Sequence, residues 1–99
     1  MDNIPVLGGW STKTRAYDGV DNALAFVLKQ LNEKRENGNE YQLGEVLKIE
    51  TQTVAGTNYR FEFIVDTLNG QQKQLCKAQV YERVWEDFIE LTHVELTPL

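Results

Sequence analysis

The sequence is poor in the residues that build disulfides and metal sites. Its 99 residues include one cysteine, Cys76, and one histidine, His93. A single cysteine excludes an internal disulfide, and the pair falls short of the three or four clustered ligands that a zinc site requires. We therefore expect neither a metal nor any other cofactor.

Positive charge is also scarce. Ten Lys and Arg residues against fifteen Asp and Glu residues give a formal net charge of −5 at pH 7. Nucleic acids and anionic membrane surfaces are bound mainly through Lys and Arg side chains, so this charge disfavours both as partners. No apolar run approaches the roughly 18 residues of a membrane span, and we read no signal peptide ahead of the domain.

The compartment stays open at this point. Small secreted domains often depend on disulfides, so their absence favours a reducing compartment such as the cytoplasm. A mature secreted form would also lack its leader, and the sequence does not separate the two.

What the sequence does contain is the composition of one small globular domain over residues 1–99. Hydrophobic residues make up 41% of the chain and charged residues 25%, which is typical of a folded domain with a modest core. Residues 1–17 follow no period and hold Pro5, Gly8 and Gly9. We interpret this stretch as an extended arm, flexible over residues 1–10, with a short edge strand as the alternative.

A long helix is predicted from Asp18. Five apolar residues recur at spacings of three and four and form one stripe: Val20, Leu24, Val27, Leu28 and Leu31. Asp18 is the expected N-cap, Asp21 suits the first turn, and Asn37 and Gly38 supply the stop. Phe26 lies off the stripe, which indicates that a curved sheet wraps around the helix.

Four strands are predicted after the helix, near residues 41–51, 58–66, 76–80 and 88–96. The second alternates apolar and polar residues, with Tyr59, Phe61, Phe63 and Val65 on one face. In the first, an inner face is expected from Tyr41, Leu43, Leu47 and Ile49, with a bulge near Gly44 to explain the misplaced Val46. Leu68, Asn69 and Gly70 are predicted to form a turn, and short turns are expected to join the strands into an antiparallel meander. The fold class is therefore α+β.

The connection between the first two of these strands is unusually apolar. Its residues are Gln52, Thr53, Val54, Ala55 and Gly56, whereas turns normally use Asn, Asp, Ser, Pro and Gly. The last connection carries a second apolar pair, Val84 and Trp85, and Trp is frequent among binding hot spots. Alternate turns of a meander lie at the same end of the sheet, so we expect the two connections to lie side by side and form a contact surface.

Gln52-x-Val54-x-Gly56 resembles the Gln-x-Val-x-Gly hairpin of the cystatins, which are protein inhibitors of papain-like cysteine proteases. Val6, Leu7 and Gly8 resemble the family's two apolar residues followed by glycine in the N-terminal arm. Val84 and Trp85 are similar to its second hairpin, although Val84 stands where Pro is usual. The lack of disulfides is similar to the stefin and plant branches, and Trp85 to the secreted branch, so the branch is left open.

The resemblance implies a cystatin-like antiparallel sheet of four to five strands wrapped around one long α-helix. It also implies a reversible, competitive, tight-binding inhibitor of papain-like proteases of the cathepsin L, B or S kind, rather than an enzyme. The implied protease-binding residues are Val6, Leu7, Gly8, Gly9, Gln52, Thr53, Val54, Ala55, Gly56, Val84 and Trp85. We expect a monomer, with a domain-swapped dimer as a further prediction if strain at Val54 favours exchange through the first hairpin.

Three other interpretations compete with this one. The first is a non-inhibitory cystatin-fold domain that acts as an interaction or scaffold module. The second is catalysis by Cys76 with His93, which is disfavoured because Cys76 lies among apolar residues where an ordinary buried thiol is expected. The third is inhibition of an asparaginyl endopeptidase through Asn39, disfavoured because Glu40 follows in place of Asp. Core packing of Trp85 or of the hairpin tip is the plain alternative to a contact surface.

Overall fold

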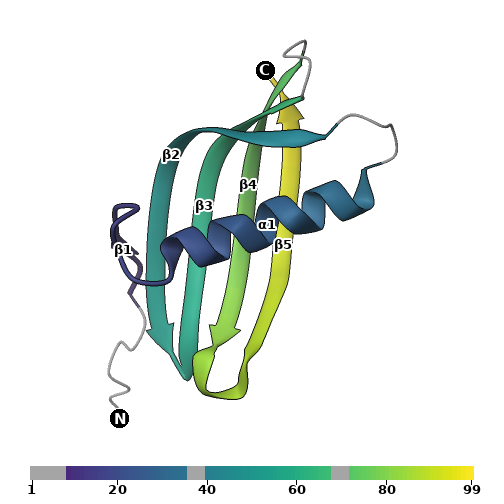
Figure 1. The fold of residues 1–99 in the computed structure, drawn as a ribbon. Helices are drawn as coiled ribbons and strands as arrows, with labels where there is room; N and C mark the ends of the chain where they lie inside the picture. The colour runs from purple at the N-terminus through teal and green to yellow at the C-terminus, as the bar shows by residue number, and fades with distance from the viewer. Residues whose placement is uncertain (1–8, 36–39, 68–71) are drawn as a thin grey trace.

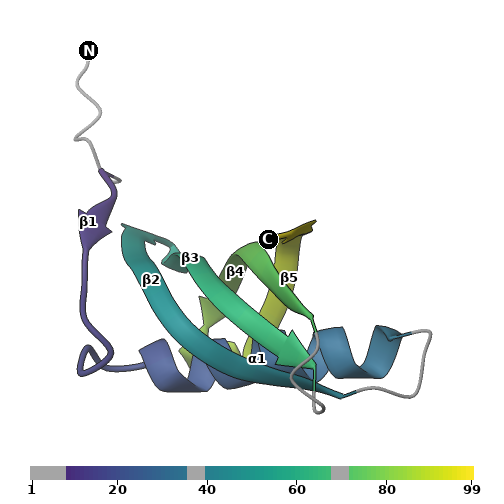
Figure 2. The same cartoon turned by 90° about the horizontal axis from the view of Figure 1, so that it is seen from above.

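The structure, a computed structural model, describes residues 9–35, 40–67 and 72–99. Its elements follow the order β1 (Ser11–Thr12), α1 (Val20–Lys34), β2 (Tyr41–Val54), β3 (Gly56–Thr67), β4 (Lys73–Arg83), the short 3-10 helix η1 (Val84–Glu86) and β5 (Phe88–Pro98). The strands form one five-stranded antiparallel sheet in chain order. Figure 1 shows α1 crossing the sheet, and Figure 2 shows the sheet curving around it. The predicted α+β meander is confirmed.

The core lies between α1 and the concave face of the sheet. The helix buries Val20, Ala23, Leu24, Val27 and Leu31, while Leu28 and Phe26 are half-buried at its sides. The sheet contributes Ile49, Tyr59, Phe61, Phe63, Val65, Cys76, Ala78 and Val80. The predicted stripe and the predicted alternation are therefore confirmed, with Ala23 as an addition.

The start of α1 differs from its prediction. Gly19, not Asp18, is the N-cap, with φ at 90° and no side-chain cap. A Cβ at Gly19 would lie 2.3 Å from the Tyr59 hydroxyl oxygen, so a glycine at this position leaves room for the Tyr59 side chain. Asp21 does stand in the first turn. The predicted stop at Asn37 and Gly38 and the turn at 68–70 lie outside the described residues.

Strand β2 contains the bulge predicted near Gly44, but Leu47 does not face the core as expected. Leu43 and Val46 oppose Val65 and Phe63, so one residue near Gly44 is extra, and Leu47 is a second extra residue before Lys48. The double shift turns Val46 against the core and leaves Leu47 50% exposed. The expectation that Leu47 faces inward was wrong, because each inserted residue reverses the alternation of the following side chains.

Candidate functional site

The two apolar connections lie at the same end of the sheet. Residue 55 forms the tip of the β2–β3 hairpin, between the paired Val54 and Gly56, and η1 connects β4 to β5. Thr57 pairs with Glu82, which brings the base of the hairpin beside the end of β4. Both connections are at the lower end of the sheet in Figure 1. We call the surface formed by Val54, Ala55, Val84 and Trp85 the loop rim.

The first half of the loop rim is a tight hairpin that points its tip into solvent. Thr53 and Ala55 are exposed, and Val54 is half-buried. Below the tip, the Asn58 side-chain amide donates a hydrogen bond of 2.8 Å to the Gln52 side-chain oxygen, so Gln52 links the two strands. The alternative in which this tip packs into the core is excluded for Ala55.

Gly56 meets two constraints that only glycine satisfies. Its φ is 119°, a left-handed value that other residues rarely adopt. A Cβ at this position would also lie 2.6 Å from the Glu82 carbonyl oxygen and 2.9 Å from both the ring and the hydroxyl of Tyr81. The Gln-x-Val-x-Gly pattern thus ends in glycine because the backbone turns sharply under a neighbouring aromatic ring.

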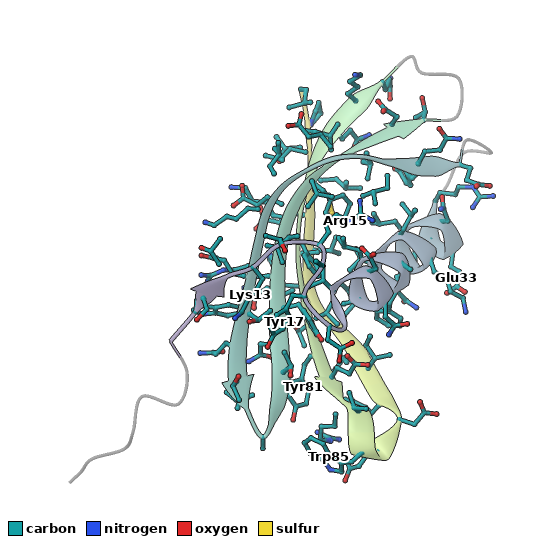
Figure 3. The ribbon with its side chains drawn as sticks, turned by 60° about the vertical axis from the view of Figure 1, so that its left-hand side comes forward. Lys13, Arg15, Tyr17, Glu33, Tyr81 and Trp85 are labelled. Carbon is teal, nitrogen blue, oxygen red and sulfur yellow. The ribbon has the colours of Figure 1, made fainter. Side chains whose placement is uncertain are left out.

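The second half of the loop rim exposes large apolar side chains. Val84 is 73% and Trp85 66% solvent-accessible. Asp87 holds this turn, with φ at 51° and its backbone N–H donating to the Val84 carbonyl at 3.1 Å. Figure 3 shows Trp85 at the end of the β4–β5 hairpin. Core packing of Trp85 is therefore excluded, because most of the residue is exposed to solvent.

A cluster that the sequence did not reveal joins the two hairpins. The Tyr81 hydroxyl donates to the Ala55 carbonyl oxygen, and Arg83 donates to the Tyr81 hydroxyl at 3.4 Å. Arg83 also pairs with Glu86, and its guanidinium carbon lies 4.3 Å from the centroid of the Phe88 ring. The hydrogen bonds to Tyr81 and then Glu86 raise the pKa of Arg83 further above its ordinary value. The sequence signal that could have revealed this cluster is Tyr81 itself, a large aromatic residue on the outer face of β4 next to the β4–β5 connection.

The root of the N-terminal arm also lies beside the first hairpin. Ser11 and Thr12 pair with Thr51 and Glu50, so the short edge strand is present, and the antiparallel direction carries Gly9 toward the hairpin tip. Gly9 is exposed, and a Cβ there would meet nothing within 4 Å. Val6, Leu7 and Gly8 lie outside the described residues, so their place in the site stays a prediction.

Trp10, which the sequence pattern did not single out, anchors this root. The Arg60 guanidinium lies 3.9 Å from the centroid of the Trp10 ring, and Arg60 Nε lies 2.7 Å from a carboxylate oxygen of Glu50. The contact fastens the chain directly after Gly9 to the outer face of β3.

Cys76 and His93 do not form a catalytic pair. Cys76 is completely buried in the core, and desolvation raises the pKa of its thiol to about 12. His93 is exposed, with its Nε2 atom 2.7 Å from a Glu95 carboxylate oxygen. A thiol with that pKa is protonated at neutral pH and is a poor nucleophile.

The described segments contain neither a candidate metal site nor a helix that could span a membrane. In residues 9–35, 40–67 and 72–99, no three His, Cys, Asp or Glu residues gather in a group that could hold a metal ion. Within the same ranges, α1 lacks the length and apolar character needed to cross a membrane.

Sequence comparisons agree on one family. A cystatin domain model matches residues 8–71. The chain is 32% identical over 90 residues to cysteine proteinase inhibitor 5 of Arabidopsis thaliana, covering 90% of this chain and 71% of that protein. It is 34% identical over 92 residues to Cystatin-SA of Homo sapiens, and the match covers 75% of this chain and 65% of that protein. Against Cystatin cpi-2 of Brugia malayi, identity is 26% with 91% and 67% coverage. The chain thus spans 65 to 71% of the length of these relatives.

Solved structures share the same fold. The crystal structure of Al-CPI superposes with a TM-score of 0.81 at 24% identity and covers 93% of this chain and 100% of that one. Dimeric human cystatin F gives a TM-score of 0.83 at 14% identity, with 93% and 88% coverage. The matching domain model, the relatives and the shared fold together show that this chain belongs to the cystatin family.

Proposed function

We propose that the protein is a reversible, competitive, tight-binding inhibitor of papain-like cysteine proteases. The observation that carries the proposal is the loop rim, where exposed Val84 and Trp85 stand beside the Ala55 tip. Exposed apolar side chains gathered on one edge of a small protein are typical of a contact surface. The plant relative bears the name cysteine proteinase inhibitor, which supports the same class of partner.

In the proposed mechanism the loop rim enters the active-site cleft of the protease and covers its catalytic cysteine. The inhibitor offers that cysteine no peptide bond in a position for attack, so no bond is made or broken and the complex is reversible. Val54, Ala55 and Trp85 bury apolar surface against the primed side of the cleft. Each Å² of buried apolar surface contributes roughly 25 cal/mol of favourable free energy. The protein itself catalyses no reaction.

The arm completes the proposed interface. Val6 and Leu7 occupy apolar subsites on the non-primed side, as the side chains of a substrate do. Gly8 and Gly9 let the backbone turn away from the catalytic cysteine, because residues without a Cβ permit close approach.

Removing residues 1–8 is expected to speed dissociation of the protease complex while leaving the far-ultraviolet circular dichroism of the inhibitor unchanged. An unchanged dissociation rate would remove the arm from the interface.

Titration of papain and of cathepsins L, B and S tests the proposal. Initial rates with a fluorogenic peptide should fall with inhibitor concentration, recover on dilution and follow competitive kinetics. Absence of inhibition at micromolar concentration would overturn the proposal and favour the non-inhibitory scaffold. Gel filtration of the same samples tests the expected monomer, and a heated sample tests the predicted domain-swapped dimer.

A matched pair of variants locates the interface. Trp85→Ala should raise the inhibition constant by about tenfold to a hundredfold, the range of an interface hot spot. Leu47→Ala removes a comparably exposed apolar side chain, seven residues before Val54 and roughly 23 Å away along the strand. Leu47→Ala should leave inhibition unchanged, and equal losses in both variants would contradict an interface at the loop rim.

A further inference from the structure

We propose that Tyr81 is a positioning residue that ties the tip of the first hairpin to the second, so that the two halves of the loop rim dock as one rigid surface. The effect of this link on protease binding rests on the proposed inhibitory function. The link itself is a property of the free protein. Tyr81 itself lies behind the loop rim, on β4.

The tip of the first hairpin depends on such a link because its backbone pairing to β4 ends at Thr57. The last pair between β3 and β4 is Thr57 with Glu82, so residues 54–56 lie past the part of the hairpin that pairs with β4, and their backbones pair within the hairpin. Beyond that pair the hairpin is a two-stranded ribbon, and isolated two-stranded ribbons are only marginally stable.

Tyr81 supplies the link through both its ring and its hydroxyl. It stands opposite Asn58 in the register, and its hydroxyl reaches the Ala55 carbonyl oxygen at the tip. Its ring and hydroxyl would lie 2.9 Å from a Cβ at position 56, so the side chain fits because Gly56 carries none. Figure 3 shows Tyr81 beside the end of the first hairpin, with Trp85 beyond it.

Arg83 extends the link into the second hairpin. It donates to the Tyr81 hydroxyl while its guanidinium covers the Phe88 ring and pairs with Glu86 at the end of η1. The Tyr81 and Phe88 rings also meet edge to face, with centroids 6.3 Å apart. Ala55 is thus connected through Tyr81 and Arg83 to both sides of the turn that presents Val84 and Trp85.

A surface held in place before binding loses less conformational freedom when it docks. Loss of the tie should therefore weaken protease binding without removing any atom that the loop rim presents to the protease. Tyr81→Phe is the sharpest variant, since it keeps the ring over Gly56 and removes only the hydroxyl. Tyr41→Phe makes the same change at the other end of β2, where the structure also holds a half-buried tyrosine.

The first test uses the free protein and needs no protease. Backbone ¹⁵N order parameters at Ala55 and Gly56 should fall in Tyr81→Phe and stay at wild-type values in Tyr41→Phe. Arg83→Gln should lower them to an intermediate extent, because the ring and hydroxyl of Tyr81 remain. Unchanged order parameters in Tyr81→Phe would overturn the inference whatever the protein inhibits.

The second test is a double-mutant cycle for papain binding. Tyr81→Phe should raise the dissociation constant about three- to tenfold, the range for one lost hydrogen bond. If Tyr81 acts by holding the tip, Val54→Ala should weaken binding less in the Tyr81→Phe background than in the wild type. Strictly additive effects would overturn the positioning role, whereas failure of the wild type to inhibit would overturn the proposed function alone.

Discussion

Gly56 combines a backbone requirement with a packing requirement at one residue. Its left-handed φ of 119° and the 2.6 Å that would separate an added Cβ from the Glu82 carbonyl oxygen act against the same substitution. Relief of the steric conflict must move the hairpin tip away from β4, which would also disturb the Tyr81 hydrogen bond. The glycine of the Gln-x-Val-x-Gly pattern is therefore a determinant of the shape of the loop rim.

Gly56→Ala is expected to destabilise the fold by about 1–3 kcal/mol, the cost of a strained backbone conformation. It should also raise the inhibition constant, because the tip is displaced. Urea unfolding and protease titration measure the two effects. Gly9→Ala is the control for unfolding, since a Cβ there meets no atom within 4 Å; equal free energies of unfolding in the two variants would contradict this account.

At the scale of elements, β1 is too short to hold the arm by backbone pairing alone. Two residues pair with β2, and Lys13 adds one backbone hydrogen bond to Ile49. The Trp10 ring under Arg60 therefore supplies a side-chain anchor, worth about 0.5–1 kcal/mol for an exposed cation–π contact. The position from which the arm leaves the sheet depends on this contact.

Fluorescence can report on the anchor because the chain has two tryptophans. In a Trp85→Phe background only Trp10 remains, and Arg60→Ala should shift its emission to longer wavelength as the indole becomes more hydrated. Lys77→Ala, which removes an exposed cation from β4, should leave the emission unchanged. The anchor would be refuted if both substitutions left Trp10 emission at the same wavelength.

At the scale of the whole molecule, two buried acidic groups link stability to alkaline pH. Burial raises the pKa of the Cys76 thiol from 9.0 to about 12. Burial, followed by the nearby Glu82 carboxylate, raises the pKa of the Tyr59 hydroxyl from 10.0 to about 12. Both groups keep their protons in the folded state at a pH where the unfolded chain releases them.

The free energy of unfolding should therefore be insensitive to these groups below about pH 9 and should fall as the pH rises from 9 to 12. Urea unfolding between pH 8 and pH 11.5 measures this slope. Cys76→Ala is expected to lower stability at every pH, because it leaves a cavity, but to flatten the slope above pH 9. A slope that stays as steep in Cys76→Ala would show that the thiol does not contribute.

The domain-swapped dimer is also a matter of the whole molecule, and its structural premise has changed. Exchange through the first hairpin was expected to relieve strain at Val54, yet the left-handed residue at the tip is Gly56. Opening the hairpin would instead break the Tyr81 link to Ala55. The dimer stays a prediction, in which inhibition should be lost together with the loop rim.

The sequence alone determined the long helix and the four long strands, and it singled out the two apolar connections between strands. The stripe from Val20 to Leu31 and the alternation of Tyr59, Phe61, Phe63 and Val65 specify a helix and a strand, because helical and extended backbones repeat with different periods. The same periods exposed the two apolar connections, since Val54 and Trp85 fall where polar turn residues are usual. The family resemblance then indicated their use.

Only the tertiary structure decided which residues meet across the sheet. Tyr81 touches Ala55, 26 residues away, and Arg60 covers Trp10, because strand register and twist bring them together. Two other differences also arise from the tertiary structure. Val46 replaces Leu47 on the inner face because of the bulges in β2, and Gly19 caps the helix because the Tyr59 side chain of β3 lies close to it. Periodicity along one strand carries no information about the alignment of its neighbour, so these contacts could not be predicted from the sequence pattern.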